Sequence, residues 1–324
     1  MIKIIVDTLG ADNGLEPIVT GVAKALAAHP ELYAVLVGPE DQLRQILDRE
    51  GADATRCEIV NASNYIRNTD PPALIFGSTD SSMALAYDRL KQDASCCALL
   101  SAGNTGALLV GSICRLGLLP GLKLPSLVSA LPCSGENLLC LVDCGSNVEC
   151  TADDLTLFAR MGNVFAKSYC GIESPRVGLM SVGREPQKGN ALTRQAYEKI
   201  SALDLNFVGN LEGSDLVSGY ADVIVADGFS GNLLLKCAES VGKAAMQIVE
   251  AYGGDLPAAQ KIRQVLFETF DFNSRGAATF LGPKKTVVKM HGAANMDTAV
   301  ASIEQILRLE KAQFSQAMAK ELEK

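Results

Sequence analysis

Short runs of β-branched and aliphatic residues alternate with longer amphipathic segments through most of this 324-residue chain. The alternation is typical of a mainly parallel sheet covered by helices on both faces, so we predict a three-layer α/β fold. The expected strands are 2–6, 33–37, 57–60, 98–101, 127–130, 138–142, 176–180, 207–208, 223–226 and 286–289. The expected helices are 16–28, 82–91, 105–116, 152–167, 187–201 and 232–251.

The chain shows no internal repeat, low-complexity tract or flexible linker. Because its hydrophobic content of 48% is enough for a large core, we expect one catalytic domain over residues 1–324. One segment departs from the rhythm of strands and helices: Gly253 and Gly254 end a long helix, and a second helix begins near Leu256 and Pro257. We expect a helical hairpin that protrudes from the domain at about 253–276.

Composition excludes several classes of protein. The formal net charge is −8 and the acidic and basic residues are interspersed, so we expect no binding of nucleic acid. The N-terminal run Met1–Asp7 is too short for the apolar region of a secretory signal. No stretch of about 18 uncharged apolar residues predicts a membrane span. We therefore expect a cytoplasmic protein.

Metal and cofactor motifs are missing from the sequence. The ten cysteines lie in apolar runs without a C-x-x-C pair, and the only histidines are His29 and His291, so we expect free thiols and no metal site. Neither the P-loop pattern nor a G-x-G-x-x-G that opens a helix occurs, so no nucleotide cofactor is expected. Ser101 lacks the G-x-S-x-G elbow of α/β hydrolases, although the sequence leaves a role for its hydroxyl open.

Turns rich in Gly, Asn, Asp and Ser follow several expected strands. The usable site of an open parallel sheet lies beyond the carboxyl ends of its strands. Glycine lets the backbone approach a ligand, and the start of the following helix favours an anion. The turns therefore predict a phosphate pocket, while simple helix capping remains the alternative for each of them. They are 7–12, 101–106, 143–147, 183–190 and 227–232.

Five runs occur in the order of a family signature: 101–106, 188–190, 207–213, 227–232 and 289–292. From Ile2 to about Leu307 the chain resembles the PlsX family of phosphate acyltransferases. The resemblance implies a fold similar to isocitrate and isopropylmalate dehydrogenases and to phosphate acetyltransferase. It also implies conversion of acyl-ACP (acyl carrier protein) and inorganic phosphate to acyl phosphate for phospholipid synthesis. A homodimer with its site near the subunit boundary is implied as well.

Attack of phosphate on a thioester needs a cation near the phosphate and donors for the developing oxyanion. We expect three catalytic residues: Lys188 to neutralise phosphate, Asn232 to donate a hydrogen bond, and His291 to protonate the leaving thiolate. A solvated lysine, a helix cap and a structural histidine are the alternatives. The residues expected to bind phosphate or substrate are Asp7, Gly10, Ser101, Gly103, Asn104, Thr105, Gly106, Asn147, Gly189, Asn190, Asp227, Gly228 and Gly231.

Two segments depart from the family pattern. The first loop, 7–12, has Ala11 where the family has a second glycine, and 70–83 has no Lys or Arg after Pro72 where the family carries basic residues. These departures leave two alternatives open. One is the acetyl-phosphate-forming component of glycine reductase, a sister group, and the other is a scaffold without catalysis.

The expected hairpin carries an apolar stripe at helical spacing. Such a stripe predicts peripheral contact with a membrane surface or packing against a dimer partner, and the sequence favours neither. Its residues are Leu256, Ile262, Val265, Leu266 and Phe270.

Overall fold

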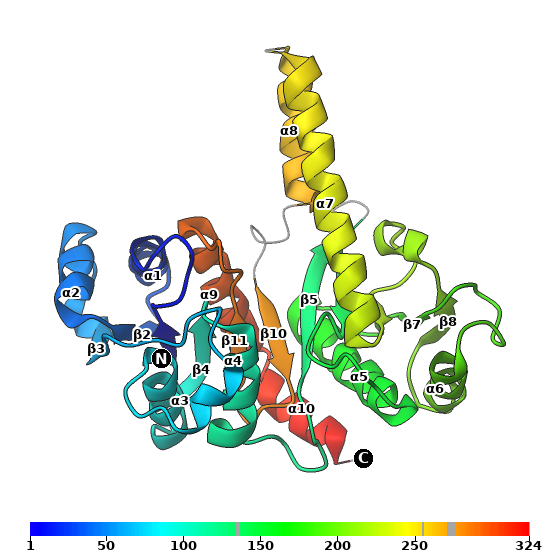
Figure 1. The fold of residues 1–324 in the computed structure, drawn as a ribbon, viewed down its shortest axis with the longest axis horizontal. Coiled ribbons are helices and arrows are strands. Elements are labelled where there is room, and N and C mark those ends of the chain that lie inside the picture. The colour runs from blue at the N-terminus through cyan, green and yellow to red at the C-terminus, as the bar shows by residue number, and fades with distance from the viewer. Residues whose placement is uncertain (134–136, 255, 271–276, 324) are drawn as a thin grey trace. The chain divides into compact units, whose positions relative to one another are not determined.

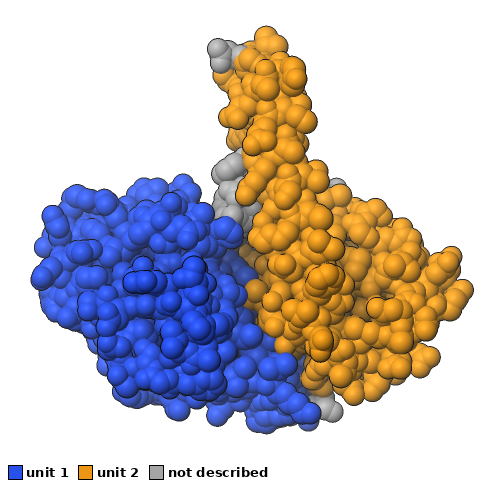
Figure 2. All heavy atoms as spheres, viewed as in Figure 1, with its two compact units in different colours: residues 1–125, 276–324 blue, residues 126–275 orange. Residues whose placement is uncertain are grey.

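The computed structural model describes residues 1–133, 137–254, 256–270 and 277–323, without the side chains of residues 267 and 268. The chain forms two compact units, coloured in Figure 2. Unit 1 comprises Met1–Pro125 and Gly276–Lys324, and unit 2 comprises Ser126–Arg275. Both contain parallel strands with helices packed on them, and the predicted three-layer α/β fold with a mostly parallel sheet is confirmed. One catalytic domain over residues 1–324 stays a prediction.

The strands of unit 1 lie in the order β3-β2-β1-β4-β11-β10. All neighbours are parallel except β10, which is antiparallel to β11. The apolar run of β1 is buried on both faces because helices cover both. The strand bounds are β1 Ile2–Asp7, β2 Leu32–Gly38, β3 Cys57–Asn61, β4 Cys96–Ser101, β10 Ala278–Leu281 and β11 Thr286–Lys289.

Helices α1, α2 and α9 cover one face of this sheet in a single apolar core, and α3 packs on β1, β2 and β4. Side chains alternate between the faces, so Ile4 and Val6 point into the first core, whereas Asp7 lies on the other face. The helix bounds are α1 Glu16–Ala28, α2 Glu40–Arg49, α3 Ser82–Gln92, α4 Thr105–Gly111, α9 Met296–Lys311 and α10 Phe314–Leu322.

The strands of unit 2 lie in the order β5-β6-β9-β7-β8, and only β5 is antiparallel to its neighbour. Helix α5 packs on β6 and β9, and α6 packs on β7, β8 and α5. The bounds are β5 Ser126–Pro132, β6 Leu138–Val142, β7 Val177–Met180, β8 Phe207–Leu211, β9 Val223–Val225, α5 Ala152–Phe165, α6 Ala191–Ser201, α7 Gly228–Gly253 and α8 Pro257–Phe270.

Helices α7 and α8 pack side by side as a long hairpin (Figure 1). The second helix begins at Pro257, near the expected position. Residues 255 and 271–276 of the expected hairpin segment lie outside the described residues. No described helix is long and apolar enough to cross a membrane.

The starts of two helices differ from those expected, and both differences concern the site. The helix expected from residue 187 begins at Ala191, because Asn190 caps it. The helix expected from residue 232 begins at Gly228, because Asp227 caps it. Lys188 therefore lies in a loop, and Asn232 lies within a helix. The sequence prediction also omitted β10, α2, α9 and α10.

Candidate active site

Three neighbouring parallel strands of unit 2, β6, β9 and β7, end at one edge of the sheet. Their loops are 143–147, 226–232 and 181–190. Backbone hydrogen bonds join the first two loops: Asp143 N–H donates to the carbonyl of Ala226 at 3.0 Å, and Gly228 N–H donates to the carbonyl of Asn147 at 2.7 Å. This edge brings most of the expected site residues of unit 2 together.

The buried carboxylate of Asp143 organises its loop. Its Oδ1 accepts hydrogen bonds from the backbone N–H groups of Leu127, Gly145 and Ser146 at 3.0–3.1 Å. Its Oδ2 accepts from the backbone N–H and the side-chain Nδ2 of Asn147 at 2.7 and 2.8 Å. The negative charge is therefore satisfied by fixed donors within the loop. Asn147, expected to bind substrate, is buried and donates its side-chain N–H to this carboxylate.

Helix α7 begins directly against this loop. Asp227 caps the helix, accepting hydrogen bonds from Ser230 N at 2.9 Å and Ser230 Oγ at 2.8 Å. A Cβ at Gly231 would overlap the carbonyl of Asp143, and one at Gly228 would overlap the backbone of Asn147, so only glycine allows this approach.

Asn232 follows as an exposed residue near the start of α7. Its Oδ1 lies beside Gly145, 3.4 Å from where a Cβ on that glycine would be. Its amide is thus held at the rim of the Asp143 loop with access to solvent.

Lys188 is presented by a tight turn before α6. Its N–H donates to the carbonyl of Glu185 at 3.0 Å, and the next residue, Gly189, has φ +104°. Asn190 then caps α6 by accepting Thr193 N–H at 2.9 Å. The Lys188 side chain is exposed and has no hydrogen bond or ion pair within the described part of the chain. It is a cation that a ligand in solution can reach.

Two contacts that the sequence did not predict hold this turn. The buried amide of Asn210, on β8, donates to the carbonyl of Glu185 at 2.8 Å. Arg184 pairs with the buried carboxylate of Asp215 at 2.6 Å. Asn210 lies beyond the expected strand 207–208, and the available signal for it was its place in the family-like run 207–213.

In unit 1, the ends of β1, β4 and β11 also lie together. Ser101 Oγ donates to Asp7 Oδ2 at 2.8 Å and accepts Gly103 N–H at 3.0 Å. A Cβ at Gly10 would lie 2.9 Å from the Cα of Gly103, so the turns after β1 and β4 touch. Ser101 is fully buried, so its hydroxyl fixes this turn and is not exposed as a nucleophile.

Asn104 is engaged on both sides of its amide. Its Oδ1 accepts the N–H of Ala107 at 2.9 Å, which caps α4, and its Nδ2 donates to the carbonyls of Arg67 and Asp70 at 2.9 and 3.2 Å. Thr105 is exposed at the first position of α4. Gly106 packs against Pro72, where a side chain would clash. In this arrangement Asn104 anchors the segment that precedes α3.

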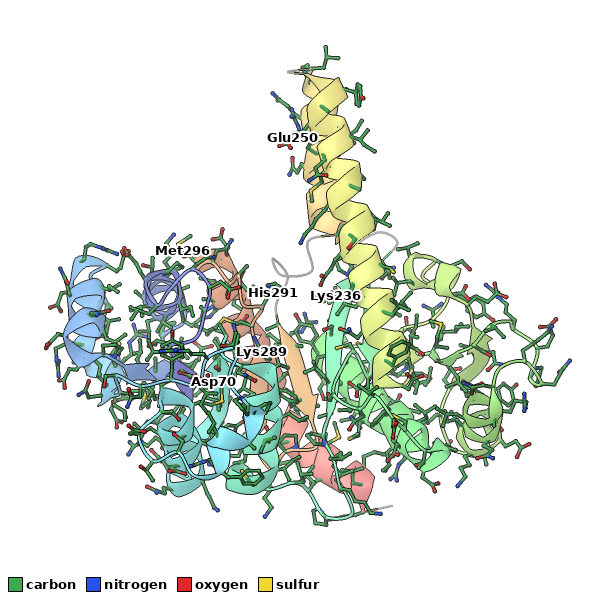
Figure 3. The ribbon with its side chains drawn as sticks, in the orientation of Figure 1. Asp70, Lys236, Glu250, Lys289, His291 and Met296 are labelled. Carbon is green, nitrogen blue, oxygen red and sulfur yellow. The ribbon has the colours of Figure 1, made fainter. Side chains whose placement is uncertain are left out.

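Lys289 ends β11, and His291 lies two residues further along the chain (Figure 3). His291 is exposed, and its Nδ1 accepts the N–H of Ala293 at 3.2 Å. Lys289, for which the sequence predicted no role, is buried.

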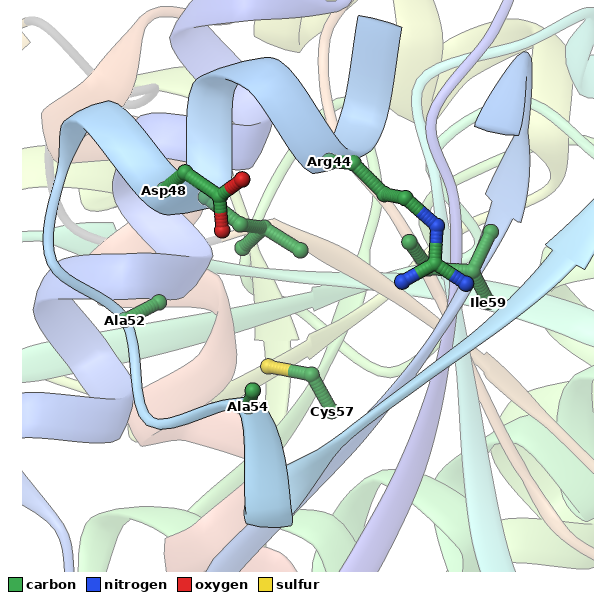
Figure 4. Close-up of a pocket in the computed structure, with 7 residues that line it drawn as sticks. Arg44, Asp48, Ala52, Ala54, Cys57 and Ile59 are labelled. Atoms are coloured by element: carbon green, nitrogen blue, oxygen red, sulfur yellow. The ribbon is translucent and has the colours of Figure 1, made fainter. Parts of the chain in front are cut away.

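Two hollows lie near the surface. One of 360 Å³ adjoins the Lys188 turn in unit 2 and is lined by Pro186, Gln187, Arg194, Tyr197, Glu198 and Ser201. The other, of 90 Å³, lies between α2 and the edge strand β3, where Arg44 and Asp48 flank the apolar side chains of Leu47, Cys57 and Ile59 (Figure 4). Only the first adjoins an expected site residue. Among the described residues, no group of three or more His, Cys, Asp or Glu side chains could hold a metal ion.

The fold is that of phosphotransacylases. A phosphotransacetylase from Streptococcus pyogenes aligns with a TM-score of 0.65 at 18% identity, covering 98% of this chain and 94% of that one. A branched-chain phosphotransacylase from Enterococcus faecalis V583 aligns with a TM-score of 0.59 at 15% identity, covering 95% and 99%. At these identities the likeness concerns the fold alone.

Sequence comparison defines the family. The family described as fatty acid synthesis protein matches residues 2–317. The phosphate acyltransferase of Clostridioides difficile (strain 630) is 34% identical over 318 residues, covering 95% of this chain and 93% of the relative. The phosphate acyltransferase of Bacillus cereus (strain B4264) is 34% identical over 311 residues, covering 94% and 93%. The chain belongs to the fatty acid synthesis protein family, and the resemblance predicted from the sequence is confirmed.

Proposed function

We propose that this protein transfers an acyl group from a thioester to inorganic phosphate and thereby forms an acyl phosphate. The observation that carries the proposal is the exposed Lys188 in the loop between β7 and α6 of unit 2, which has no hydrogen bond or ion pair among the residues that the structure describes. Kinship with phosphate acyltransferases supports the same chemistry.

In the proposed reaction, an oxygen of hydrogen phosphate attacks the carbonyl carbon of the thioester. The new C–O bond forms, the C–S bond breaks, and the proton of hydrogen phosphate ends on the departing thiolate. Lys188 neutralises charge on the phosphate, and Asn232 donates a hydrogen bond to the carbonyl oxygen as it becomes negative. His291, exposed two residues beyond the end of β11, is the proposed carrier of this proton: its imidazole accepts the proton from the phosphate and passes it to the thiolate. No covalent intermediate on the enzyme is needed.

The proposed acyl donor is acyl-ACP, and the product would serve phospholipid synthesis. Family membership and the description fatty acid synthesis protein support this choice. The roles expected for the remaining residues predicted to bind substrate stay predictions, and a homodimer is the proposed assembly. No second function is favoured by a specific observation.

The test is to incubate purified protein with phosphate and, separately, long-chain acyl-ACP, long-chain acyl-CoA or an acetyl thioester. Hydroxylamine traps acyl phosphate as a hydroxamate. We expect the highest rate with long-chain acyl-ACP. A reaction confined to the acetyl thioester would instead favour the glycine reductase component, and no product from any donor would favour a scaffold.

The hairpin is the proposed site of peripheral membrane contact, at the cytoplasmic face. Three of its apolar side chains are exposed: Leu256 is 65% exposed, Ile262 50% and Val265 53%. Exposed apolar side chains on a protruding hairpin fit insertion at the lipid boundary. The test is co-sedimentation with liposomes. We expect Leu256→Glu and Val265→Glu to reduce binding while the enzyme stays dimeric; loss of the dimer in analytical ultracentrifugation would show that the hairpin packs against a second copy.

A further inference from the structure

Two cysteine thiols of unit 2 are in contact inside the fold. The Sγ atoms of Cys140 and Cys170 lie 3.6 Å apart. Cys140 lies in the middle of β6 and is fully buried. Cys170 ends the π-helical turn Ala166–Cys170 that continues α5, and it is half-buried. Neither cysteine is in a disulfide, so the contact joins two thiols.

The packing of α5 on β6 brings the two sulfurs together. Val142 and Cys140 are two residues apart on β6, so their side chains point to the same face of the sheet. On the helix, Gly162 lies against Val142: a Cβ added to Gly162 would be 2.9 Å from Val142 Cγ1.

Cys170 lies eight residues beyond Gly162 along the chain. Two α-helical turns take up about seven residues, and a π-helical turn adds about one more. Cys170 therefore returns to the face of the helix on which Gly162 meets β6. The close approach at Gly162 and the thiol contact at Cys170 are two points of one helix-on-strand packing.

The surroundings of the two sulfurs differ, and the difference fixes the order in which they react. The hydrogen bond with Cys170 and burial together raise the pKa of Cys140 well above its usual value, so Cys140 keeps its proton. Its S–H then donates to the sulfur of Cys170. A thiolate on Cys170 is stabilised by this hydrogen bond and is partly open to solvent. An oxidant therefore reaches Cys170 first, with Cys140 as the second thiol at contact distance.

We propose that Cys140 and Cys170 form a redox-sensitive pair, which a hydroperoxide such as hydrogen peroxide converts into a disulfide. The thiolate of Cys170 attacks one peroxide oxygen, the O–O bond breaks, and Cys170 becomes a sulfenic acid while the departing hydroxide takes up a proton as water. The sulfur of Cys140 then attacks the sulfenic sulfur, and the S–O bond breaks. Hydroxide leaves with the proton of Cys140 as a second water. The thiols lose two electrons and two protons in all, and the peroxide gains them.

The disulfide closes the segment that carries the 143–147 loop. Residues 141–169 contain the end of β6, this loop and all of α5. The sulfurs must approach from 3.6 Å to about 2 Å, which rotation about the Cα–Cβ bonds and a small adjustment at the end of the helix provide. A cross-link that closes a loop of about 30 residues restricts the unfolded chain, so oxidation stabilises unit 2. The reaction involves neither a thioester nor phosphate, so this inference is independent of the proposed function.

The experiment treats the reduced, folded protein with hydrogen peroxide and then alkylates the remaining thiols with iodoacetamide in denaturant. Proteolysis and mass spectrometry with fragmentation locate the cross-links. We expect a Cys140–Cys170 disulfide that dithiothreitol reverses. The oxidised protein should melt about 5–10 °C above the reduced protein, as expected for a loop of this length.

Three variants separate the pair from the other thiols. Cys170→Ser should give neither the cross-link nor the rise in melting temperature. Cys140→Ala leaves Cys170 without its second thiol, so peroxide should carry Cys170 on to the sulfinic acid. Cys237→Ser is the matched control, because it removes an exposed thiol of α7, and it should behave like the parent.

The proposal is overturned if peroxide gives no Cys140–Cys170 disulfide in the folded parent. It is equally overturned if Cys170 of the parent is oxidised to the sulfinic acid while Cys140 stays a thiol, since the contact would then not allow the second step. A rise in melting temperature that persists in Cys170→Ser would assign the stabilisation to other cysteines and contradict the proposal. Circular dichroism before oxidation establishes that each protein is folded, and Cys170→Ala replaces Cys170→Ser if the serine variant is not.

Discussion

The strand-end edges of the two units use the same kinds of residue in opposite ways. In unit 2 the buried carboxylate of Asp143 is satisfied by backbone and amide donors, so the nearby cation, Lys188, is left exposed and uncommitted. In unit 1 the cation, Lys289, is itself buried and donates hydrogen bonds to the backbone carbonyls of Ala102 and Met290. A cation held inside the fold cannot also meet a phosphate in solution. The position of a turn at a strand end therefore does not decide its chemistry, because the lysine at one edge is exposed and the lysine at the other is hydrogen-bonded inside the fold.

The two edges differ in how well they favour the binding of an anion. The edge of unit 2 offers a free positive charge and two helix starts, the features that favour an anion. The edge of unit 1 contains the carboxylates of Asp7 and Asp12 around one lysine, which disfavours phosphate. We therefore expect phosphate to bind at Lys188, and we expect Asp7, Gly10, Ser101 and Gly103 to shape the turns of unit 1.

The largest expected effect concerns Asp143. If backbone donors hold the unit 2 edge, Asp143→Ala leaves three buried N–H donors, on Leu127 and Asn147, without partners. Each unsatisfied buried donor costs about 1–3 kcal/mol, so we expect unfolding by urea to show a loss of about 3–5 kcal/mol. Asp227→Ala is the matched control, because losing a helix cap costs about 1 kcal/mol. Similar losses of unfolding free energy in the two variants would show that Asp143 stabilises the fold no more than an ordinary helix cap does.

The next effect concerns turnover. If Lys188 and Asn232 act on the transition state, Lys188→Ala and Asn232→Ala should each lower the rate of acyl phosphate formation by at least roughly a hundredfold, since losing one such donor costs about 2.7–4 kcal/mol. Both side chains are exposed, so melting temperatures should stay within a few degrees of the parent. The rate is measured at saturating phosphate by hydroxylamine trapping.

Lys199→Ala provides a control for that comparison, because Lys199 is an exposed lysine of α6 that pairs with Asp153. It should retain the parental rate. Near-parental turnover in either Lys188→Ala or Asn232→Ala would mean that the residue is a solvated side chain that does not act on the transition state.

The sequence predicted those features of the two edges that depend on residues close together in the chain. The turns at 143–147 and 227–232 were predicted because Asp, Asn and Gly act within a few residues of their own position. The starts of α6 and α7 were misplaced, although Asn190 and Asp227 are ordinary caps that carried the correct signal. The helices α2, α9 and α10 were omitted although helical spacing of apolar residues was present in each.

The burial of Lys289 was not predictable in the same way. Its surroundings come from residues 7, 101 and 102, which are far from it in the chain and meet it only through the order β1-β4-β11. The sequence shows a lysine after two valines at the end of an expected strand, and the same pattern fits an exposed strand end. The engagement of Asn104 with Arg67 and Asp70 is equally non-local. The sequence therefore indicated candidate residues and could not separate those that face ligand from those that hold the fold.

The smallest expected effect is a pH dependence of stability that only the unit 1 edge should show. Burial raises the pKa of Asp7 from 3.8 to about 6, so the folded protein binds a proton more tightly there than the unfolded chain does. The stability from this proton is fully present below about pH 3.8 and is lost as the pH rises through about 6. A shift of about two units corresponds to about 2–3 kcal/mol.

In Asp7→Asn, which cannot ionise, the stability measured by urea unfolding between pH 4 and 7 should lack this decline. Asp41→Asn, on the exposed surface of α2, controls for the change in net charge. An equal decline in the parent and in Asp7→Asn would mean that ionising the Asp7 carboxylate costs no stability. The contrast between the buried charge at the edge of unit 1 and the exposed charge of Lys188 at the edge of unit 2 would then no longer hold.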